Sequence, residues 1–152
     1  MGSAVVVIGV GNPDRGDDAA GRRVAAALRV SAPPGVVVMD SDGDPAAIMD
    51  AWDGADLAVV VDAMVSGSAP GTVRRFDATE TPLPISVHLA STHGMGAAEA
   101  IELARSLDRL PERLLVYGIE GSVFHPGMEM SQPVSDAVDI AKGMVLAEVA
   151  DA

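Results

Sequence analysis

The residues best suited to chemistry in this sequence are two carboxylates and a histidine, spaced far apart along the chain. Asp18 ends an Asp17-Asp18 pair, Asp62 follows a run of three valines, and His93 stands in Ser91-Thr92-His93-Gly94. An imidazole with two carboxylates makes a site suited to nickel, zinc, manganese or iron, with coordination positions left open. These residue types do not choose among the four metals.

Each of these residues also has a purely structural interpretation. Asp62 ends an apolar run, where an ionised carboxylate is costly to bury unless something pairs with it, but a turn aspartate could bond nearby backbone N–H groups instead. His93 would serve equally as a loop or capping residue, and the Asp17-Asp18 pair would favour a helix N-terminus through the helix dipole. The position of these residues in the fold has to decide between the structural and the functional interpretation.

Short aliphatic runs bounded by Gly, Pro or Asp predict five strands. Several runs are apolar throughout, which is typical of parallel strands buried on both faces. The predicted strands are Ala4–Val10, Val36–Asp40, Asp56–Ala63, Thr72–Phe76 and Leu114–Ile119, and Asp77–Ser91, with Pro82 and Pro84, is predicted to be a loop.

Segments with helical spacing of apolar residues separate the strands. One follows the first strand, one opens with Asp44 as N-cap and Pro45 in its first turn and runs to Trp52, one begins near Gly94, and one begins at Pro133. The resulting order β-α-β-α-β-β-α-β-α predicts an α/β fold, a single three-layer domain with a mostly parallel five-stranded sheet and helices on both faces.

This fold would bring the candidate residues together. Ligands of open α/β sheets bind beyond the carboxyl ends of the strands. Asp18 follows the first strand, Asp62 ends the third and His93 precedes the third helix, so they would converge on one edge of the sheet. Further polar residues fall at the same edge: Asn12, Asp14, Asp17, Asp40, Asp42, Ser91, Thr92 and Glu120.

Composition excludes several classes of function. A formal charge of −12 argues against binding to nucleic acids or anionic membranes, although it also serves solubility. The absence of cysteine excludes thiolate metal ligands and a cysteine nucleophile. No signal peptide or apolar stretch of about 20 residues is evident, so a cytoplasmic protein is expected.

Three common functional motifs are incomplete or absent. Gly9-Val10-Gly11 begins like a dinucleotide-binding fingerprint, but Asp14 stands at the third glycine, where its charge would oppose a pyrophosphate. Asp40 could still mimic the ribose-binding acid of such sites, so nucleotide binding stays a minor alternative. There is neither a P-loop nor a Gly-x-Ser-x-Gly serine hydrolase motif.

Five blocks, in order and spanning nearly the whole chain, resemble the hydrogenase maturation proteases. The first is Val7-Ile8-Gly9-Val10-Gly11-Asn12-Pro13 with Asp17-Asp18 and Gly21, and the second is Val61-Asp62-Ala63 with Ala69-Pro70-Gly71-Thr72-Val73. The others are Ser91-Thr92-His93-Gly94-Met95-Gly96, Val116-Tyr117-Gly118-Ile119-Glu120, and Met130 to Val134. A single Gly-x-Gly would mean little, whereas five ordered blocks are specific.

The resemblance implies an endopeptidase, one domain over residues 1–152, that removes the C-terminal extension of the nickel-loaded large-subunit precursor of a nickel–iron hydrogenase. It implies Asp18, Asp62 and His93 as catalytic and metal-binding residues, with nickel carried by the precursor and zinc or cadmium as substitutes. Asp40 matches a further acid of the family with a less certain alignment. Asp18, Ala19 and the Asp40-Ser41-Asp42-Gly43 turn depart from the commoner pattern.

No residue is a self-evident nucleophile, so a carboxylate or a metal-bound water is the expected attacking group. A noncatalytic module that binds or escorts the precursor would keep the same ligands and is the alternative. The sequence does not indicate which hydrogenase is the substrate, or the oligomeric state.

Overall fold

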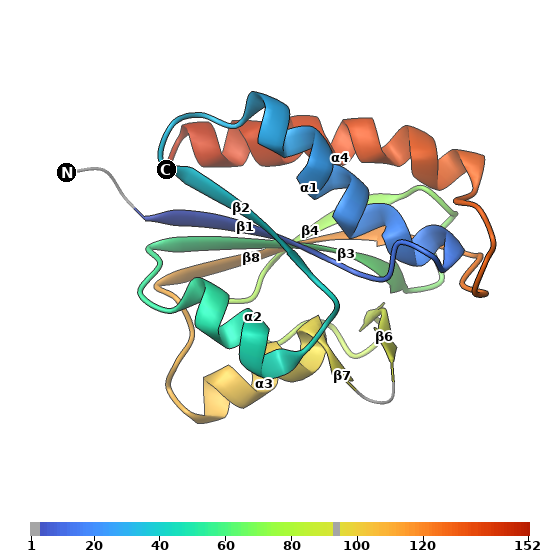
Figure 1. The fold of residues 1–152 in the computed structure, drawn as a ribbon. Coiled ribbons are helices and arrows are strands. Elements are labelled where there is room, and N and C mark those ends of the chain that lie inside the picture. The colour runs from blue at the N-terminus through green and yellow to red at the C-terminus, as the bar shows by residue number, and fades with distance from the viewer. Residues whose placement is uncertain (1–3, 93–94) are drawn as a thin grey trace.

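Three strands at the centre of the sheet are apolar along almost their whole length. They are β1 (Val5–Val10), β3 (Leu57–Val65) and β8 (Arg113–Glu120), and nearly all of their residues are buried. Such strands need cover on both faces. The computed structural model, which describes residues 4–92 and 95–152, places them side by side in the middle of a sheet (Figure 1).

The sheet has the order β2-β1-β3-β8-β4. The edge strand β2 (Val36–Ser41) runs parallel to β1, and the other edge strand β4 (Val73–Asp77) runs antiparallel to β8. The five predicted strands are all confirmed, each within two residues at either end. The α/β class, the mostly parallel sheet and the three layers are confirmed as well.

The predicted loop over Asp77–Ser91 is only partly correct. Two-residue β5 (His88–Leu89) pairs antiparallel with the end of β3, which makes the sheet six-stranded rather than five-stranded, and β6 (Ser91–Thr92) pairs with β7 (Met95–Gly96) in a separate ribbon. A strand of only two residues is too short to show an alternation of apolar and polar side chains in the sequence. These strands exist because a neighbouring strand offers free backbone groups, which a local pattern cannot reveal.

Four helices cover the sheet. α1 (Ala20–Ser31) and α4 (Gln132–Ala150) lie on one face, and α2 (Pro45–Trp52) and α3 (Ala97–Ser106) lie on the other (Figure 1). α4 begins one residue before the predicted Pro133, and α3 begins after Gly94, at Ala97. Asp44 occupies the N-cap of α2 in an extended conformation with Pro45 in the first turn, as predicted, although its side chain makes no capping bond.

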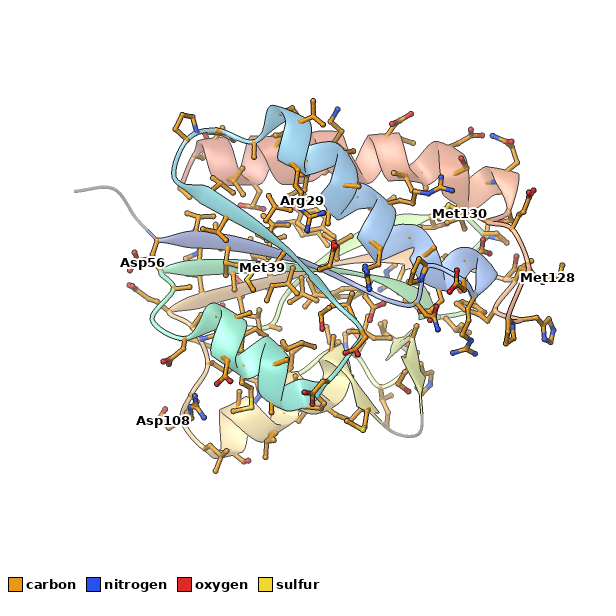
Figure 2. All side chains as sticks on the ribbon, viewed as in Figure 1. Arg29, Met39, Asp56, Asp108, Met128 and Met130 are labelled. Atoms are coloured by element: carbon orange, nitrogen blue, oxygen red, sulfur yellow. The ribbon has the colours of Figure 1, made fainter. Side chains whose placement is uncertain are left out.

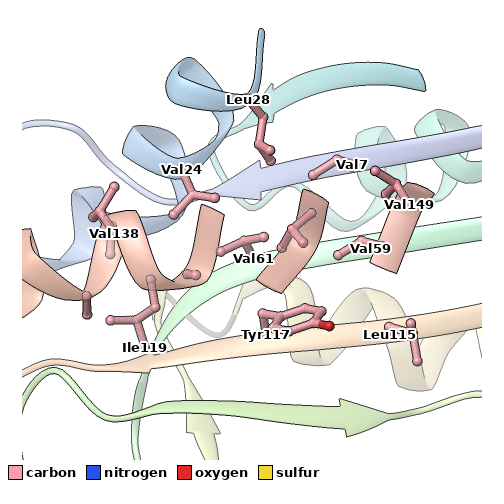
Figure 3. Close-up of a cluster of buried hydrophobic side chains, with 14 of the residues drawn as sticks. Val7, Val24, Leu28, Val59, Val61, Leu115, Tyr117, Ile119, Val138 and Val149 are labelled. Carbon is pink, nitrogen blue, oxygen red and sulfur yellow. The ribbon is translucent and has the colours of Figure 1, made fainter. Parts of the chain in front are cut away.

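Each face of the sheet has its own hydrophobic core. Between the sheet and the α1–α4 pair, Val7, Val59, Leu115 and Ile119 meet the apolar sides of both helices (Figure 3). On the other face, Trp52 is fully buried between the sheet and α2–α3 and donates its indole N–H to the Arg109 carbonyl. Both faces of the central strands are therefore packed.

The loops after β1, β3 and β8 emerge at one edge of the sheet, since these three strands run parallel. The first contains the short 3₁₀ helix η1 (Gly16–Ala19). No helix among the described residues is long and apolar enough to cross a membrane.

Candidate functional site

Asp62 is a fully buried carboxylate for which the described part of the chain supplies no hydrogen-bond partner. It sits near the end of β3 opposite Gly118 of β8, it is 0 % exposed, and neither carboxylate oxygen is hydrogen-bonded to any described residue. Burial raises its pKa well above the usual value, and the charges of Asp18 and Glu99 add to the rise, while the Ala63 backbone N–H, which is nearby but outside hydrogen-bonding geometry, lowers it in part. An orphaned buried carboxylate of this kind calls for a cation or a proton.

Asp18 lies beside it, on η1. The carboxylate is 4 % exposed, accepts a hydrogen bond from the Asn12 backbone N–H at 3.2 Å, and forms an ion pair with Arg15 at 3.8 Å. Burial raises the pKa of Asp18 despite these two favourable partners. Both buried carboxylates, Asp18 on η1 and Asp62 on β3, therefore have a raised pKa, and the charge of Asp18 contributes to the rise at Asp62.

Glycines allow this close approach. A Cβ on Gly21, in the first turn of α1, would lie 2.2 Å from the Val61 carbonyl oxygen. Gly11 has φ +145°, and a Cβ there would lie 1.9 Å from the Asp18 carbonyl oxygen. Glycine at both places lets η1 and α1 settle directly on β1 and β3, and so sets Asp18 next to Asp62.

Asp17 has the opposite role to its neighbour. It is 0 % exposed and accepts backbone N–H groups of Ser122, Val123 and Ser131 at 2.8–2.9 Å, together with the Ser131 hydroxyl. Burial would raise the pKa of Asp17, but these donors outweigh it and leave the pKa below the usual value. Asp17 is therefore a structural anchor that ties the β8–α4 loop to η1, a role different from the predicted charge at a helix N-terminus.

Two other predicted edge residues are also occupied by structural partners. Asp40 pairs with Arg22 at 3.7 Å and with Arg29 at 3.1 Å, both from α1. Glu120 is buried and accepts the Ser66 backbone N–H and hydroxyl, which holds the β3–β4 loop. Both carboxylates therefore have partners among the described residues, whereas Asp62 has no hydrogen-bond donor there.

The structure adds Glu99, which sequence reasoning missed. It lies in the first turn of α3, and its negative charge raises the pKa of Asp62. Its position three residues after Gly96, on the helix that follows the histidine block, was the available signal.

The segment that leads to His93 is tied to the same edge. The Ala90 N–H donates to the carbonyl of Ala63, the residue after Asp62, at 2.9 Å. His93 itself lies outside the described residues. The described residues do not bring three ligating side chains together at metal-binding distance. Asp18 and Asp62 are the predicted ligands that the structure does bring together.

A divalent cation fits what the described residues offer. It would neutralise two buried carboxylates and satisfy the orphaned oxygens of Asp62. Two carboxylates supply only part of a coordination shell, so they suit a divalent metal whose remaining ligands come from another group.

Comparison with known proteins decides the family. The model of the hydrogenase maturation protease family HycI matches residues 23–148. The chain belongs to the hydrogenase maturation protease family.

Individual relatives agree with this assignment. The protease is 27% identical to the hydrogenase 2 maturation protease of Escherichia coli over 94% of this chain and 88% of that protein. It is 30% identical to the hydrogenase expression/formation protein HupD of Thiocapsa roseopersicina over 76% of this chain, a match that spans about half of that longer protein (53%).

The fold agrees over nearly the full length. The hydrogenase maturating endopeptidase HybD from E. coli superposes with a TM-score of 0.80 and 26% identity, covering 97% of this chain and 92% of that one. HybD from Thermococcus kodakarensis gives a TM-score of 0.75 and 27% identity, covering 93% and 95%. The resemblance drawn from the five sequence blocks is confirmed, and the protein is a protease.

Proposed function

We propose that this protease removes the C-terminal extension of the nickel-loaded large-subunit precursor of a nickel–iron hydrogenase. The observation that carries the proposal is Asp62, a fully buried carboxylate with no hydrogen-bond partner among the described residues, next to the buried Asp18. A resident structural role would have given it donors, as Asp17 has. Asp62 instead suits a cation that arrives with the substrate.

Asp18, Asp62 and His93 are the residues proposed to hold that nickel. A bound nickel supplies positive charge that orients and polarises the peptide carbonyl nearby. The chain's own contribution is to place two carboxylates of raised pKa at the site, where either can accept or return a proton during peptide hydrolysis. Zinc or cadmium suits the same ligands.

The direct test is cleavage of purified precursor, made with and without nickel, by metal-free protease. We expect a shift in large-subunit mobility only for nickel-loaded precursor. Asp62→Asn should abolish the shift, whereas the matched control Asp139→Asn, at an exposed position on α4, should leave it unchanged. Equal cleavage of both precursors would overturn nickel recognition.

The alternative of a noncatalytic escort has its own signature in this experiment, namely a stable complex with nickel-loaded precursor and no cleavage. Cleavage that depends on zinc added to the protease, irrespective of nickel in the precursor, would indicate a conventional metallopeptidase instead.

Metal binding by the isolated protease tests the third ligand. Titration with Ni²⁺, Zn²⁺ or Cd²⁺ in a calorimeter should show one site, weaker below about pH 6 because an imidazole must lose its proton to bind. His93→Ala should weaken it. Equal affinity in wild type and variant would exclude His93 and leave the exposed His88 and His125 as candidates.

A further inference from the structure

Asp62 points towards the face of the sheet that α2 and α3 cover. Its second neighbours along β3, Val60 and Met64, belong to the hydrophobic core on that face. Its immediate neighbours, Val61 and Ala63, belong to the core under α1 and α4. Because side chains alternate between the two faces of a strand, the Asp62 carboxylate lies on the α2–α3 side. Groups on α2 or α3, rather than on α1 or α4, are therefore the helical groups that adjoin it.

The first turn of α3 lies at the edge of the sheet where β3 ends. Figure 2 shows Asp108, which follows the C-terminal end of α3, at the same end of the molecule as Asp56, which precedes β3. The N-terminal end of α3 therefore points towards the opposite edge, which carries Asp62. There the Ala90 N–H donates to the Ala63 carbonyl at 2.9 Å, which fixes the segment leading into α3 to the end of β3.

Glu99 projects from this first turn of α3. Ala97 and Ala100 on either side are fully buried in the α2–α3 core, while Glu99 is exposed. Its carboxylate lies against Gly96, because a Cβ built on that glycine would be 3.2 Å from Oε1 of Glu99 and 2.9 Å from the Ala90 carbonyl oxygen. The carboxylate therefore turns back over the N-terminus of α3, towards the segment that is bonded to β3.

No described residue gives Glu99 a structural partner. It forms no ion pair with a described arginine or lysine. A glutamate at the third position of a helix can accept the backbone N–H of the N-cap residue. Glu99 has that position, yet it accepts no hydrogen bond from Gly96 or from any other described residue. Its placement at this edge is thus not explained by a bond within the described part of the chain.

The charge of Glu99 does reach the site. It adds to the rise in the pKa of Asp62 that burial causes first and the charge of Asp18 increases. Three acids from three elements therefore act on one another where Asp62 is buried with no hydrogen-bond donor among the described residues. A divalent cation at this point would turn each of these repulsions into an attraction.

The three acids differ in how a cation would meet them. Asp62 is 0 % exposed and Asp18 is 4 % exposed, whereas Glu99 is open to solvent. The described residues do not bring three ligating side chains to metal-binding distance, so Glu99 acts across a gap, through its charge. A cation that approaches from solvent is attracted by Glu99 before it reaches the two buried carboxylates.

We propose that Glu99 is a positioning residue of this protease, whose charge draws the divalent metal carried by the precursor into the site and strengthens its binding at Asp18 and Asp62. Glu99 stays outside the ligand set and takes no part in bond breaking. The inference rests on the proposed function, because it takes Asp18 and Asp62 as the residues that hold the metal.

Calorimetric titration of the metal-free protease with Cd²⁺ at low ionic strength tests this role. Glu99→Gln should weaken binding by about fivefold, because the divalent ion loses the attraction of one nearby charge. Glu99→Lys changes the charge by two units instead of one, so its loss should be the square of that factor, roughly 25-fold. In about 0.5 M salt both losses should fall below about threefold, since salt screens exposed charges.

Glu112→Gln is the matched control. It makes the same change at another exposed position, just before β8 at the opposite edge of the sheet, and should leave Cd²⁺ affinity unchanged. Urea unfolding of the same variants separates a role in the helix from a role at the site. A lower urea midpoint for Glu99→Gln with wild-type Cd²⁺ affinity would mean that Glu99 serves only the helix dipole, and it would overturn the proposal.

A direct ligand would give a different pattern. Glu99→Asp keeps the charge and should bind Cd²⁺ within about twofold of wild type. If Glu99→Asp instead loses as much affinity as Glu99→Gln, and the losses are equal at low and high salt, Glu99 is a ligand and the role through charge is refuted.

Cleavage of nickel-loaded precursor gives a second measurement. Glu99→Gln should raise KM while kcat stays within about twofold, because only the attraction of the metal is weakened. A fall in kcat at unchanged KM would place Glu99 in the chemical step and overturn the proposal. These failures differ from failure of the proposed function, in which wild type itself neither binds Cd²⁺ nor cleaves nickel-loaded precursor.

Discussion

Asp17→Asn is the substitution whose effect on stability the structure specifies most closely. The carboxylate is fully buried, one oxygen accepts the Ser122 and Val123 N–H groups, and the other accepts the Ser131 N–H. Asparagine keeps the shape but replaces one acceptor oxygen with an NH₂ donor. Whichever way the amide turns, at least one buried N–H faces a donor.

The cost follows from these contacts. Leaving one buried backbone N–H unsatisfied costs about 1–3 kcal/mol, and exchanging charge-assisted hydrogen bonds for neutral ones removes about 1 kcal/mol more. We expect the free energy of unfolding to fall by about 3 kcal/mol, which for a chain of this length lowers Tm by roughly 6–12 °C.

Urea unfolding followed by circular dichroism at pH 7 measures this difference. Asp139→Asn is the control, an exposed carboxylate on α4 whose substitution should change stability by less than about 0.5 kcal/mol. An Asp17→Asn variant as stable as this control would refute the anchoring role of Asp17.

The pH dependence gives an independent check. The pKa of Asp17 in the folded protein lies below its usual value of 3.8, so its contribution is fully present above that value and is lost as the pH falls through the lower folded pKa. The stability gap between wild type and Asp17→Asn should therefore be constant from pH 7 to about pH 5 and should narrow below about pH 4. A gap that stays constant into strong acid would contradict the role of the charge.

Three further outcomes are expected. Asp62→Asn should unfold at the same or a higher urea concentration than wild type at pH 7, because it removes a buried carboxylate to which no described residue donates a hydrogen bond; a clearly lower midpoint would count against an unsatisfied carboxylate at this position. Burial and Glu148 together raise the pKa of Tyr117, the single tyrosine, to about 12, and Glu148→Gln should lower that pKa in an ultraviolet titration because Glu148 accepts the hydrogen bond of the tyrosine hydroxyl at 2.8 Å; an unchanged titration would exclude the bond. Gly21→Ala should cost about 3 kcal/mol and reduce cleavage, because its Cβ would press on the Val61 carbonyl; wild-type Tm and activity would disprove the close contact.

The apolar central strands were predictable because the need to bury them on both faces can be read from a short stretch of sequence. Runs such as Val59-Val60-Val61 can only be buried on both faces, which already implies helices above and below a parallel sheet. Parallel strands in turn place their carboxyl ends at one edge, so the meeting of Asp18 and Asp62 was expected before any coordinates. The glycine-containing sequence blocks also indicated the family. Their glycines are required by the fold, because a Cβ at Gly11 or Gly21 would collide with the backbone of a neighbouring segment.

The roles of individual acids were decided only by the tertiary structure. Asp17 and Asp18 are adjacent and identical in type, yet one is saturated with hydrogen bonds from residues 105–114 positions away and the other faces Asp62. Asp40 likewise resembles a candidate ligand in sequence but is paired with arginines of α1. A carboxylate's function depends on which donors surround it, and those donors come from distant segments. Residue type and spacing therefore determined where the site lies, and long-range packing determined which carboxylate was left without a partner.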